Sequence, residues 1–216
     1  MITVIDYGMG NLHSVKNALD FLGIPNKVIG LAKEIESADA LILPGVGAFP
    51  DAMSTLDESR ISQIIREKCA AGTPLLGICL GMQLLVDSST EVRPTKGLGL
   101  IRGKCEKMQP AGLKIPHMGW NDLTVDKKDC PILSLTKTGD YVYFVHSYKV
   151  ILDNPENNLA AHTVYGDTVS AVITDNKNVF GTQFHPEYGS TVLNPHPLFV
   201  AFVKAAIENE KTTAKG

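Results

Sequence analysis

Apolar residues in the N-terminal part of the chain fall into short runs separated by stretches with helical periodicity. The runs predict buried strands at Ile2–Asp6, Lys27–Ile29, Ala40–Leu43 and Pro74–Ile78. Helical spacing predicts helices between Asn11, a typical N-cap, and Gly23, a typical stop, then over residues 61–72 and Leu80–Val86. Strands that alternate with helices are joined by right-handed crossovers, so this part predicts a parallel sheet.

The rest of the chain has a different pattern, with strand-like segments separated by short polar loops. These segments are Leu100–Met108, Asn121–Val125, Tyr141–Val145, Ala160–Val164, Val169–Ile173 and Val179–Phe184. They favour antiparallel or mixed strands added to the parallel core. Pro197–Asn209 predicts a C-terminal helix, and residues 210–216 predict a frayed tail. We therefore expect residues 1–216 to form one α/β domain, with a mainly parallel central sheet flanked by helices.

Composition and charge narrow the classes of function. Hydrophobic residues make up 44% and charged residues 20% of the chain, and the formal net charge is −3. Lys and Arg are scattered, which argues against a nucleic-acid or anionic membrane surface. No apolar stretch approaches the length of a membrane span and no export signal is visible, so we expect a cytoplasmic protein. None of the four cysteines lies in a Cys-x-x-Cys pair, and we expect no metal, cofactor or disulfide.

The segment Gly77-Ile-Cys79-Leu-Gly81 follows a predicted strand and begins a predicted helix. A nucleophile flanked by glycines at this position is typical of a nucleophile elbow, here with cysteine in place of serine. The helix N-terminus favours a thiolate, and the Leu80 N–H can face a developing oxyanion. The alternative is a buried structural cysteine, which is the commoner fate of a Cys between apolar residues.

A thiolate nucleophile needs a base, and the base needs a group that orients it. His185 ends a predicted strand, and Glu187 follows two residues later, on the same side of extended backbone. A carboxylate placed there can fix the tautomer of the imidazole. The alternative is that both are ordinary loop residues at the end of a strand.

A second oxyanion donor has to come from another loop. The best candidate is the segment Pro44-Gly45-Val46-Gly47, because it follows a strand and its glycines let the backbone approach a ligand closely. No Gly-Lys-Ser/Thr follows, so the segment does not match a phosphate-binding loop. It could instead be an ordinary turn between a strand and a helix.

Gly77–Gln83 together with Phe184-His185-Pro186-Glu187 resembles the triad, or class I, glutamine amidotransferases. Further segments are similar to the glutaminase subunits of imidazole glycerol phosphate synthases: Asp6–Asn11, Leu43–Phe49, Pro116–Asn121 and Phe144–Tyr148. The resemblance extends from Ile2 to about Phe202. It implies a flavodoxin-like fold, no cofactor, and hydrolysis of L-glutamine to glutamate and ammonia through a thioester on Cys79.

The resemblance also implies roles for individual residues. His185 protonates the leaving ammonia and Glu187 orients it, while Leu80 and one of Gly45–Gly47 supply the oxyanion hole. The residues that the resemblance assigns to glutamine binding are Gln83, His146, Ser147 and Tyr148. Without it, Gln83 reads as a solvated helix residue and the other three as the polar end of a strand.

A partner is implied as well, a (β/α)8 barrel synthase that forms a heterodimer with the glutaminase and uses its ammonia to make imidazole glycerol phosphate and aminoimidazole carboxamide ribotide in histidine biosynthesis. The residues expected at that interface are Asn11, with the loop that starts at Gly8, and His117, Trp120 and Asn121. A core position is the alternative for Trp120. The chain departs from the family at Tyr188, where relatives usually carry a basic residue, and Val86–Lys96 receives no role.

Two other readings remain open on the sequence. The chain could serve a different synthase, such as those for anthranilate or pyridoxal phosphate, although the Asp6–Asn11 and Pro116–Asn121 segments argue against this. It could also be a non-catalytic binding or redox-sensing module that uses Cys79 as a reactive thiol. His185 and Glu187 argue against a sensor, which needs neither.

Overall fold

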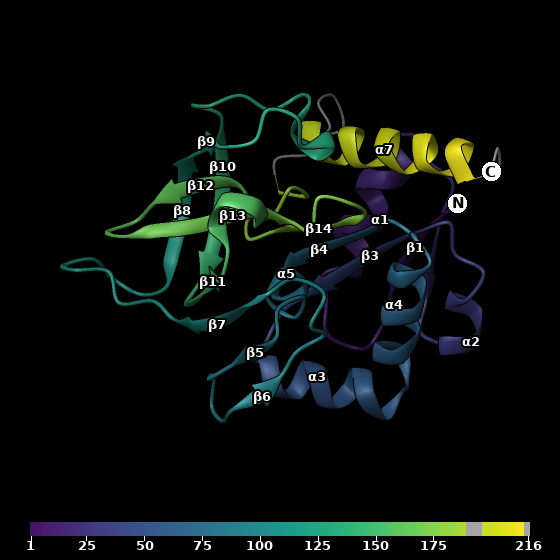
Figure 1. Cartoon of the computed structure of the whole chain (residues 1–216), viewed down its shortest axis with the longest axis horizontal. Coiled ribbons are helices and arrows are strands. Elements are labelled where there is room, and N and C mark those ends of the chain that lie inside the picture. The colour runs from purple at the N-terminus through teal and green to yellow at the C-terminus, as the bar shows by residue number, and fades with distance from the viewer. Residues whose placement is uncertain (189–195, 214–216) are drawn as a thin grey trace.

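The computed structural model describes residues 1–188 and 196–213, with the backbone alone over 207–213 (Figure 1). Its main sheet has eight strands in the order β2-β1-β3-β4-β14-β13-β12-β9. The strands are β1 (Ile2–Ile5), β2 (Asn26–Ile29), β3 (Ala40–Gly45), β4 (Leu75–Cys79), β9 (Thr124–Val125), β12 (Leu159–Val164), β13 (Thr168–Thr174) and β14 (Val179–Thr182). The first five in the sheet order are parallel, including β14, which was expected among the antiparallel or mixed strands, and the last three are antiparallel to their neighbours.

Alternation along the parallel strands sends side chains into two separate cores. Ile42 of β3 and Leu76 of β4 belong to one core, while Leu41 and Leu75 belong to the other. Successive side chains of a strand point to opposite faces, so a sheet covered on both sides needs strands that are apolar throughout. The nearly continuous apolar runs of these strands meet that requirement.

Helices cover both faces of the parallel half (Figure 1). One core contains side chains of α1 (Leu12–Phe21) and α7 (Pro197–Thr213), and the other contains side chains of α3 (Phe49–Glu58) and α4 (Ile61–Ala70). α1 begins as predicted, because the Asn11 side chain accepts a hydrogen bond from the Ser14 N–H at 3.4 Å. It ends before Gly23, which has a φ of +65°.

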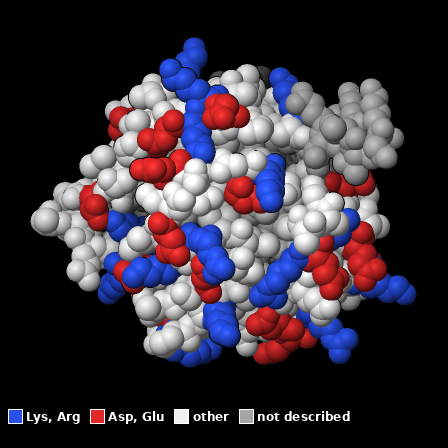
Figure 2. Space-filling model, in the orientation of Figure 1, with Lys and Arg blue, Asp and Glu red and all other residues white. Residues whose placement is uncertain are grey.

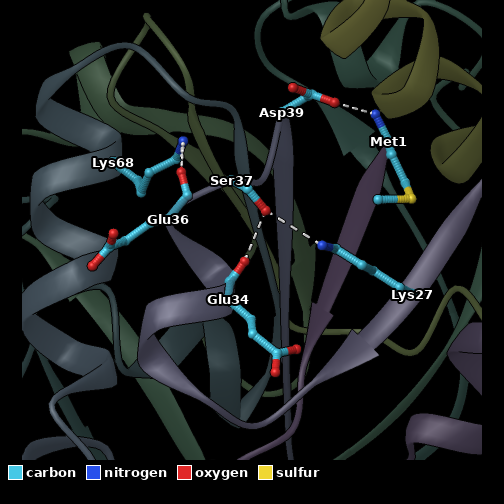
Figure 3. A network of polar contacts seen from close by, with 7 residues as sticks. All are labelled: Met1, Lys27, Glu34, Glu36, Ser37, Asp39 and Lys68. Carbon is cyan, nitrogen blue, oxygen red and sulfur yellow. Dashed lines mark hydrogen bonds and ion pairs between the residues drawn. The ribbon is translucent and has the colours of Figure 1, made fainter.

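The short helix α2 (Ala32–Ile35) and the turn after it are tied to the sheet by polar contacts (Figure 3). The Ser37 hydroxyl donates to the Glu34 carbonyl at 3.0 Å and accepts from Lys27 of β2 at 3.4 Å. Lys68 of α4 donates to the Glu36 carbonyl at 3.0 Å. These contacts hold the edge of the sheet that lies farthest from the antiparallel strands.

Two smaller sheets extend the antiparallel half. One pairs β8 (His117–Asp122) with β10 (Tyr141–His146), and the other has the order β11-β7-β5-β6. Its strands are β5 (Ser88–Ser89), β6 (Thr95–Lys96), β7 (Gly103–Lys107) and β11 (Tyr148–Leu152). The remaining elements are the turn of 3-10 helix η1 (Pro131–Leu133) and α6 (Pro155–Asn158).

The structure corrects several predicted boundaries. The predicted helix Leu80–Val86 is only a single turn, α5 (Leu80–Gln83), and the predicted strand Leu100–Met108 begins at Gly103. Helix α7 continues to Thr213, beyond its predicted end at Asn209, and residues 214–216 of the predicted tail lie outside the described residues. Helix α3 and strand β11 were not predicted, although the buried residues of α3 recur at helical spacing and those of β11 alternate.

Charged side chains of both signs are interspersed across the face shown in Figure 2. Neighbouring opposite charges form surface pairs there and elsewhere, such as Arg102 with Asp87 at 3.2 Å. Within residues 1–188 and 196–213, no helix combines the length and apolarity needed to cross a membrane.

Candidate active site

Cys79 lies at the junction of β4 and α5, and its backbone is strained. Its φ of 55° and ψ of −110° fall in a region that residues other than glycine rarely adopt. Such a conformation costs about 1–3 kcal/mol and persists only where the surroundings enforce it. A Cβ on Gly77 would lie 2.6 Å from the Gly81 carbonyl oxygen, and a Cβ on Gly81 would lie 1.8 Å from that of Leu43. Both glycines are therefore required by the close packing of the turn, which has the form of the predicted elbow.

His185 and Glu187 lie together beside this cysteine. The His185 Nδ1 is 2.8 Å from the Glu187 Oε1, and both side chains are buried. The imidazole also interacts with the Cys79 thiol, and this interaction acts on its pKa. The His185 N–H donates to the Tyr143 carbonyl at 3.1 Å, which anchors the segment to β10. The structure thus brings the three predicted residues into one connected array.

The contacts of His185 decide its protonation state. Burial disfavours the charged imidazolium, but hydrogen bonds and charge interactions with Cys79 and Glu187 outweigh it and raise the pKa of His185 to about 10. At neutral pH the imidazole therefore carries a proton. An imidazolium next to a thiol favours the thiolate, and it can later deliver its proton to a leaving group.

The predicted oxyanion segment ends β3 directly beside the cysteine. Gly45 is the register partner of Cys79 in the parallel pair, and a Cβ on it would lie 2.8 Å from the Gly81 nitrogen. Gly47 has a φ of +101° and packs against the Met9 side chain in the loop before α1. Because α5 has only four residues, its macrodipole is smaller than the sequence predicted, and any oxyanion stabilisation there comes from the local N–H groups.

These residues surround a cavity of about 430 Å³. Its lining comprises Val46, Gly47, Cys79, Leu80, Gln83, Glu91, Pro116, Val145, His146, Ser147, Tyr148, His185 and Tyr188. All four residues predicted to bind glutamine are among them. Gln83 is buried rather than solvated, and its amide donates to the Tyr148 carbonyl at 3.1 Å.

His146 contributes to the wall of the cavity with both of its ring nitrogens already engaged. Nδ1 lies 2.8 Å from the Tyr148 carbonyl, so it carries the hydrogen, and Nε2 then accepts from His117 Nδ1 at 3.1 Å. Burial lowers the pKa of each of these two histidines to about 4. Both rings are therefore neutral, and this hydrogen-bond chain orders the Ser147–Tyr148 backbone.

His117 requires a correction, because it was expected at a partner interface and is only 2% exposed. Alternation along β8 sends His117 and Asn121 inward, where the His117 ring stacks on Phe144 at 4.7 Å, and sends Trp120 outward. Trp120 is 57% exposed, which excludes the core alternative. The Asn11 side chain is used as the cap of α1, and Asn121 donates to the Val164 carbonyl at 3.0 Å.

Two residues of the site were missed on the sequence. Glu91 lines the cavity, and its carboxylate accepts from the Phe49 N–H at 2.8 Å. It lies in the stretch to which no role was given, because an irregular loop offers no periodic signal. The Gln183 amide donates to the Cys79 sulfur at 3.7 Å and accepts from Gln83 at 3.0 Å. Its signal was available, since Gln183 is two residues before His185 in the segment that directly follows β14.

Comparison with known proteins now places the chain in a family. The family model for class-I glutamine amidotransferases matches residues 3–205. The chain belongs to the class-I glutamine amidotransferases. Two relatives of this amidotransferase are named imidazole glycerol phosphate synthase subunit HisH. The protein of Caldanaerobacter subterraneus subsp. tengcongensis is 52% identical, over 87% of this chain and 90% of its own, and that of Bacillus subtilis is 47% identical, over 97% and 99%.

Solved structures of more distant proteins share the fold of this amidotransferase. PurLQS from Thermotoga maritima matches with a TM-score of 0.74 at 22% identity, covering 94% of this chain and 97% of that one. The glutaminase domain of Trypanosoma brucei CTPS, solved with bound acivicin, matches with a TM-score of 0.71 at 17% identity, covering 96% and 93%. These matches and the sheet order confirm the predicted fold class.

Proposed function

We propose that this chain is the glutamine-hydrolysing subunit of an imidazole glycerol phosphate synthase, with Cys79, His185 and Glu187 as its catalytic residues. The family and the names of the most similar relatives support the activity. The observation that carries the assignment of residues is the array at the strained turn, where a buried histidine joins a thiol to a carboxylate.

In the first half of the reaction, the Cys79 thiolate forms a bond to the side-chain carbonyl carbon of glutamine. The carbonyl electrons move to the oxygen, which the Leu80 N–H and an N–H of the Gly45–Gly47 segment stabilise. His185 then gives its proton to the amide nitrogen. The C–N bond breaks, ammonia leaves, and a glutamyl thioester remains on the sulfur.

In the second half, neutral His185 accepts a proton from water as the water oxygen attacks the thioester carbon. The C–S bond breaks, glutamate leaves, and the thiolate and the imidazolium are restored. Glu187 holds Nδ1 throughout, which keeps Nε2 available for both proton transfers.

The rest of the cavity has the groups needed to recognise an amino acid. The Glu91 carboxylate suits the substrate ammonium, and the backbone of Ser147 and Tyr148 suits its polar groups. Gln83 and Gln183 form a hydrogen-bonded floor between Tyr148 and the sulfur. We assign glutamine binding to this set, with His146 as a support of the wall.

Covalent labelling tests the assignment of the nucleophile. An electrophilic glutamine analogue, 6-diazo-5-oxonorleucine, should modify Cys79 stoichiometrically, as read by peptide mass spectrometry, and excess glutamine should protect it. Cys69, Cys105 and Cys130 serve as internal controls because they are buried and lie outside this cavity. Labelling spread over the other cysteines, or labelling that glutamine does not prevent, would contradict the proposal.

The partner in this proposal is a (β/α)8 barrel synthase that receives the ammonia. A surface of exposed side chains next to the cavity, formed by Val46, Met118, Trp120, Tyr141 and Tyr188, suits this docking. Exposed aromatic side chains next to an active site are typical anchors of protein interfaces. We place the complex in the cytoplasm, because a thiolate nucleophile requires a compartment that keeps thiols reduced.

Titration of the barrel subunit tests the docking surface. Trp120→Ala should weaken association by about 2 kcal/mol, or about 30-fold in Kd, as measured by calorimetry. Leu31→Ala is the matched control, because Leu31 is exposed but precedes α2 at the far edge of the sheet. Equal affinity of the two variants would place the partner on a different surface.

A further inference from the structure

Tyr188 lies at the mouth of the cavity and covers one face of the His185 ring. The two rings are stacked, with centroids 4.9 Å apart and an interplanar angle of 21°. A turn fixes this arrangement, because the Tyr188 N–H donates to the His185 carbonyl at 3.1 Å. The Tyr188 side chain is 48% exposed, so its burial in the core does not explain the stacking.

The hydrogen bonds of His185 restrain one motion of its ring, tilting out of its own plane, only weakly. Glu187 holds the Nδ1 nitrogen, and Cys79 interacts with the imidazole as well. Such contacts of ring nitrogens are strongest in the plane of the ring. They resist sliding within the plane, but resist tilting out of the plane only weakly, since hydrogen bonds tolerate moderate deviations in angle. A ring stacked on the face opposes that tilt.

Tyr188 is itself held from the other side. The Tyr143 ring of β10 meets it edge to face, with centroids 5.6 Å apart at 73°, and Trp120 of β8 meets Tyr143 in the same way at 5.7 Å and 68°. Aromatic pairs prefer this geometry. Three aromatic rings therefore lead from the exposed Trp120 to the histidine.

We propose that Tyr188 is a positioning residue, whose ring holds the His185 imidazole in the plane that joins Cys79 to Glu187 and favours its protonated form. This role rests on the proposed function, in which His185 is the proton carrier. An aromatic face attracts a cation, so the ring adds to the stabilisation that the carboxylate provides. A lysine at this position would remove the stacking and place a like charge beside the imidazolium.

Four variants separate the contributions of the ring. Tyr188→Phe keeps the aromatic face, Tyr188→Leu keeps apolar cover without it, Tyr188→Ala removes both, and Tyr188→Lys adds a positive charge. Phe21→Ala is the control, because Phe21 is an exposed aromatic residue at the end of α1 that neither lines the cavity nor belongs to the docking surface. Thermal unfolding confirms that each variant is folded.

The readouts are kcat and KM for glutamine in the complex with the barrel subunit, and the pKa of His185 by NMR of labelled histidine. The ionisable groups that act on His185 are Cys79, Glu187 and, at longer range, neutral His146, and none of the variants alters them. His185→Gln identifies the resonance, and His185→Ala gives the rate without the proton carrier.

We expect Tyr188→Phe to match the wild type. Tyr188→Leu and Tyr188→Ala should lower kcat about tenfold with little change in KM, and should lower the His185 pKa by about half a pH unit, the size of a cation–aromatic contact at a half-exposed site. Tyr188→Lys should lower the pKa further. A wild-type kcat and pKa in both Tyr188→Leu and Tyr188→Ala would overturn the role of Tyr188, whereas full activity of His185→Ala would overturn the proposed function.

Discussion

The parallel and antiparallel halves of the main sheet contribute different residues to the candidate site. The parallel strands β3 and β4 carry Cys79 and the Gly45–Gly47 segment at their carboxyl ends, where backbone geometry determines what the turn can do. The antiparallel half, with the β8–β10 pair, contributes the Ser147–Tyr148 wall and the exposed Trp120. Strand β14 borders both halves and leads to His185. The parallel half thus provides the proposed nucleophile, the antiparallel half provides part of the recognition wall, and the proposed proton carrier lies at their boundary.

The largest effect should come from replacing His185, the residue at the boundary between the two halves. His185→Ala should lower kcat about 10⁴-fold or more, because a nucleophile and its base act as a unit. His162→Ala is the matched control, since His162 also pairs with a carboxylate, that of Asp126, at 2.8 Å, but on the antiparallel strands and outside the cavity. Steady-state glutamate release by the two variants measures the difference. Comparable losses would contradict the assignment of His185.

The second prediction concerns the close backbone packing of the turn that follows β4 in the parallel half. Gly81→Ala should destabilise the protein by about 3 kcal/mol, because its Cβ would lie 1.8 Å from the Leu43 carbonyl oxygen and neither backbone segment can move freely. Gly139→Ala should cost only about 1 kcal/mol, since Gly139 has a φ of +95° but open space around it. Urea unfolding compares the two. Equal costs would mean that the elbow relaxes more easily than its packing suggests.

Substitution of a residue assigned to substrate binding should affect KM more than kcat. Glu91→Gln removes the charge that we assign to the substrate ammonium but keeps an acceptor for the Phe49 N–H. We expect KM for glutamine to rise about tenfold or more, as for the loss of one charged hydrogen bond, with kcat changed far less. Glu58→Gln on the exposed end of α3 is the control. A fall in kcat at constant KM would place Glu91 in the chemistry instead.

The smallest effect concerns the neutral pair His117 and His146. Their folded pKa values of about 4 lie below the unfolded value of about 6.5, so the unfolded chain binds more protons between these limits. Their contribution to stability is complete above pH 6.5 and is lost as the pH falls through 4. His117→Gln should therefore reduce the fall in unfolding free energy between pH 7 and pH 5 by about 1 kcal/mol. His13→Gln, at an exposed position, should leave that difference unchanged.

The same division governs how much of the molecule the sequence predicted. The parallel strands and the turn at Cys79 were predictable because glycine spacing and apolar runs are local signals of backbone geometry. The resemblance pointed to Gln83 and Ser147, whose position in the cavity arises only when α5 and the start of β11 come together. Glu91 was not predictable, because an irregular loop carries it to the cavity from far along the chain.

Glu91 was missed, whereas His117 was predicted but at the wrong kind of position. Its segment was expected at an interface as one unit, yet strand alternation separates its residues, so that His117 faces inward and Trp120 outward. The length of α5 was also overestimated, because the apolar residues after Gln83 turn back into the core instead of continuing a helical face. Both errors arose because all residues of a sequence segment were expected to share one environment, whereas neighbouring side chains of the folded chain lie in different environments.

Glutamate release from glutamine is the decisive measurement of whether Cys79 is the nucleophile. It is made for this chain alone, with the barrel synthase and its ribotide ligand, and again with Cys79→Ala. We expect that the wild-type chain releases glutamate with the liganded partner, and that Cys79→Ala stays folded and releases none above background. Normal hydrolysis by Cys79→Ala would contradict this assignment.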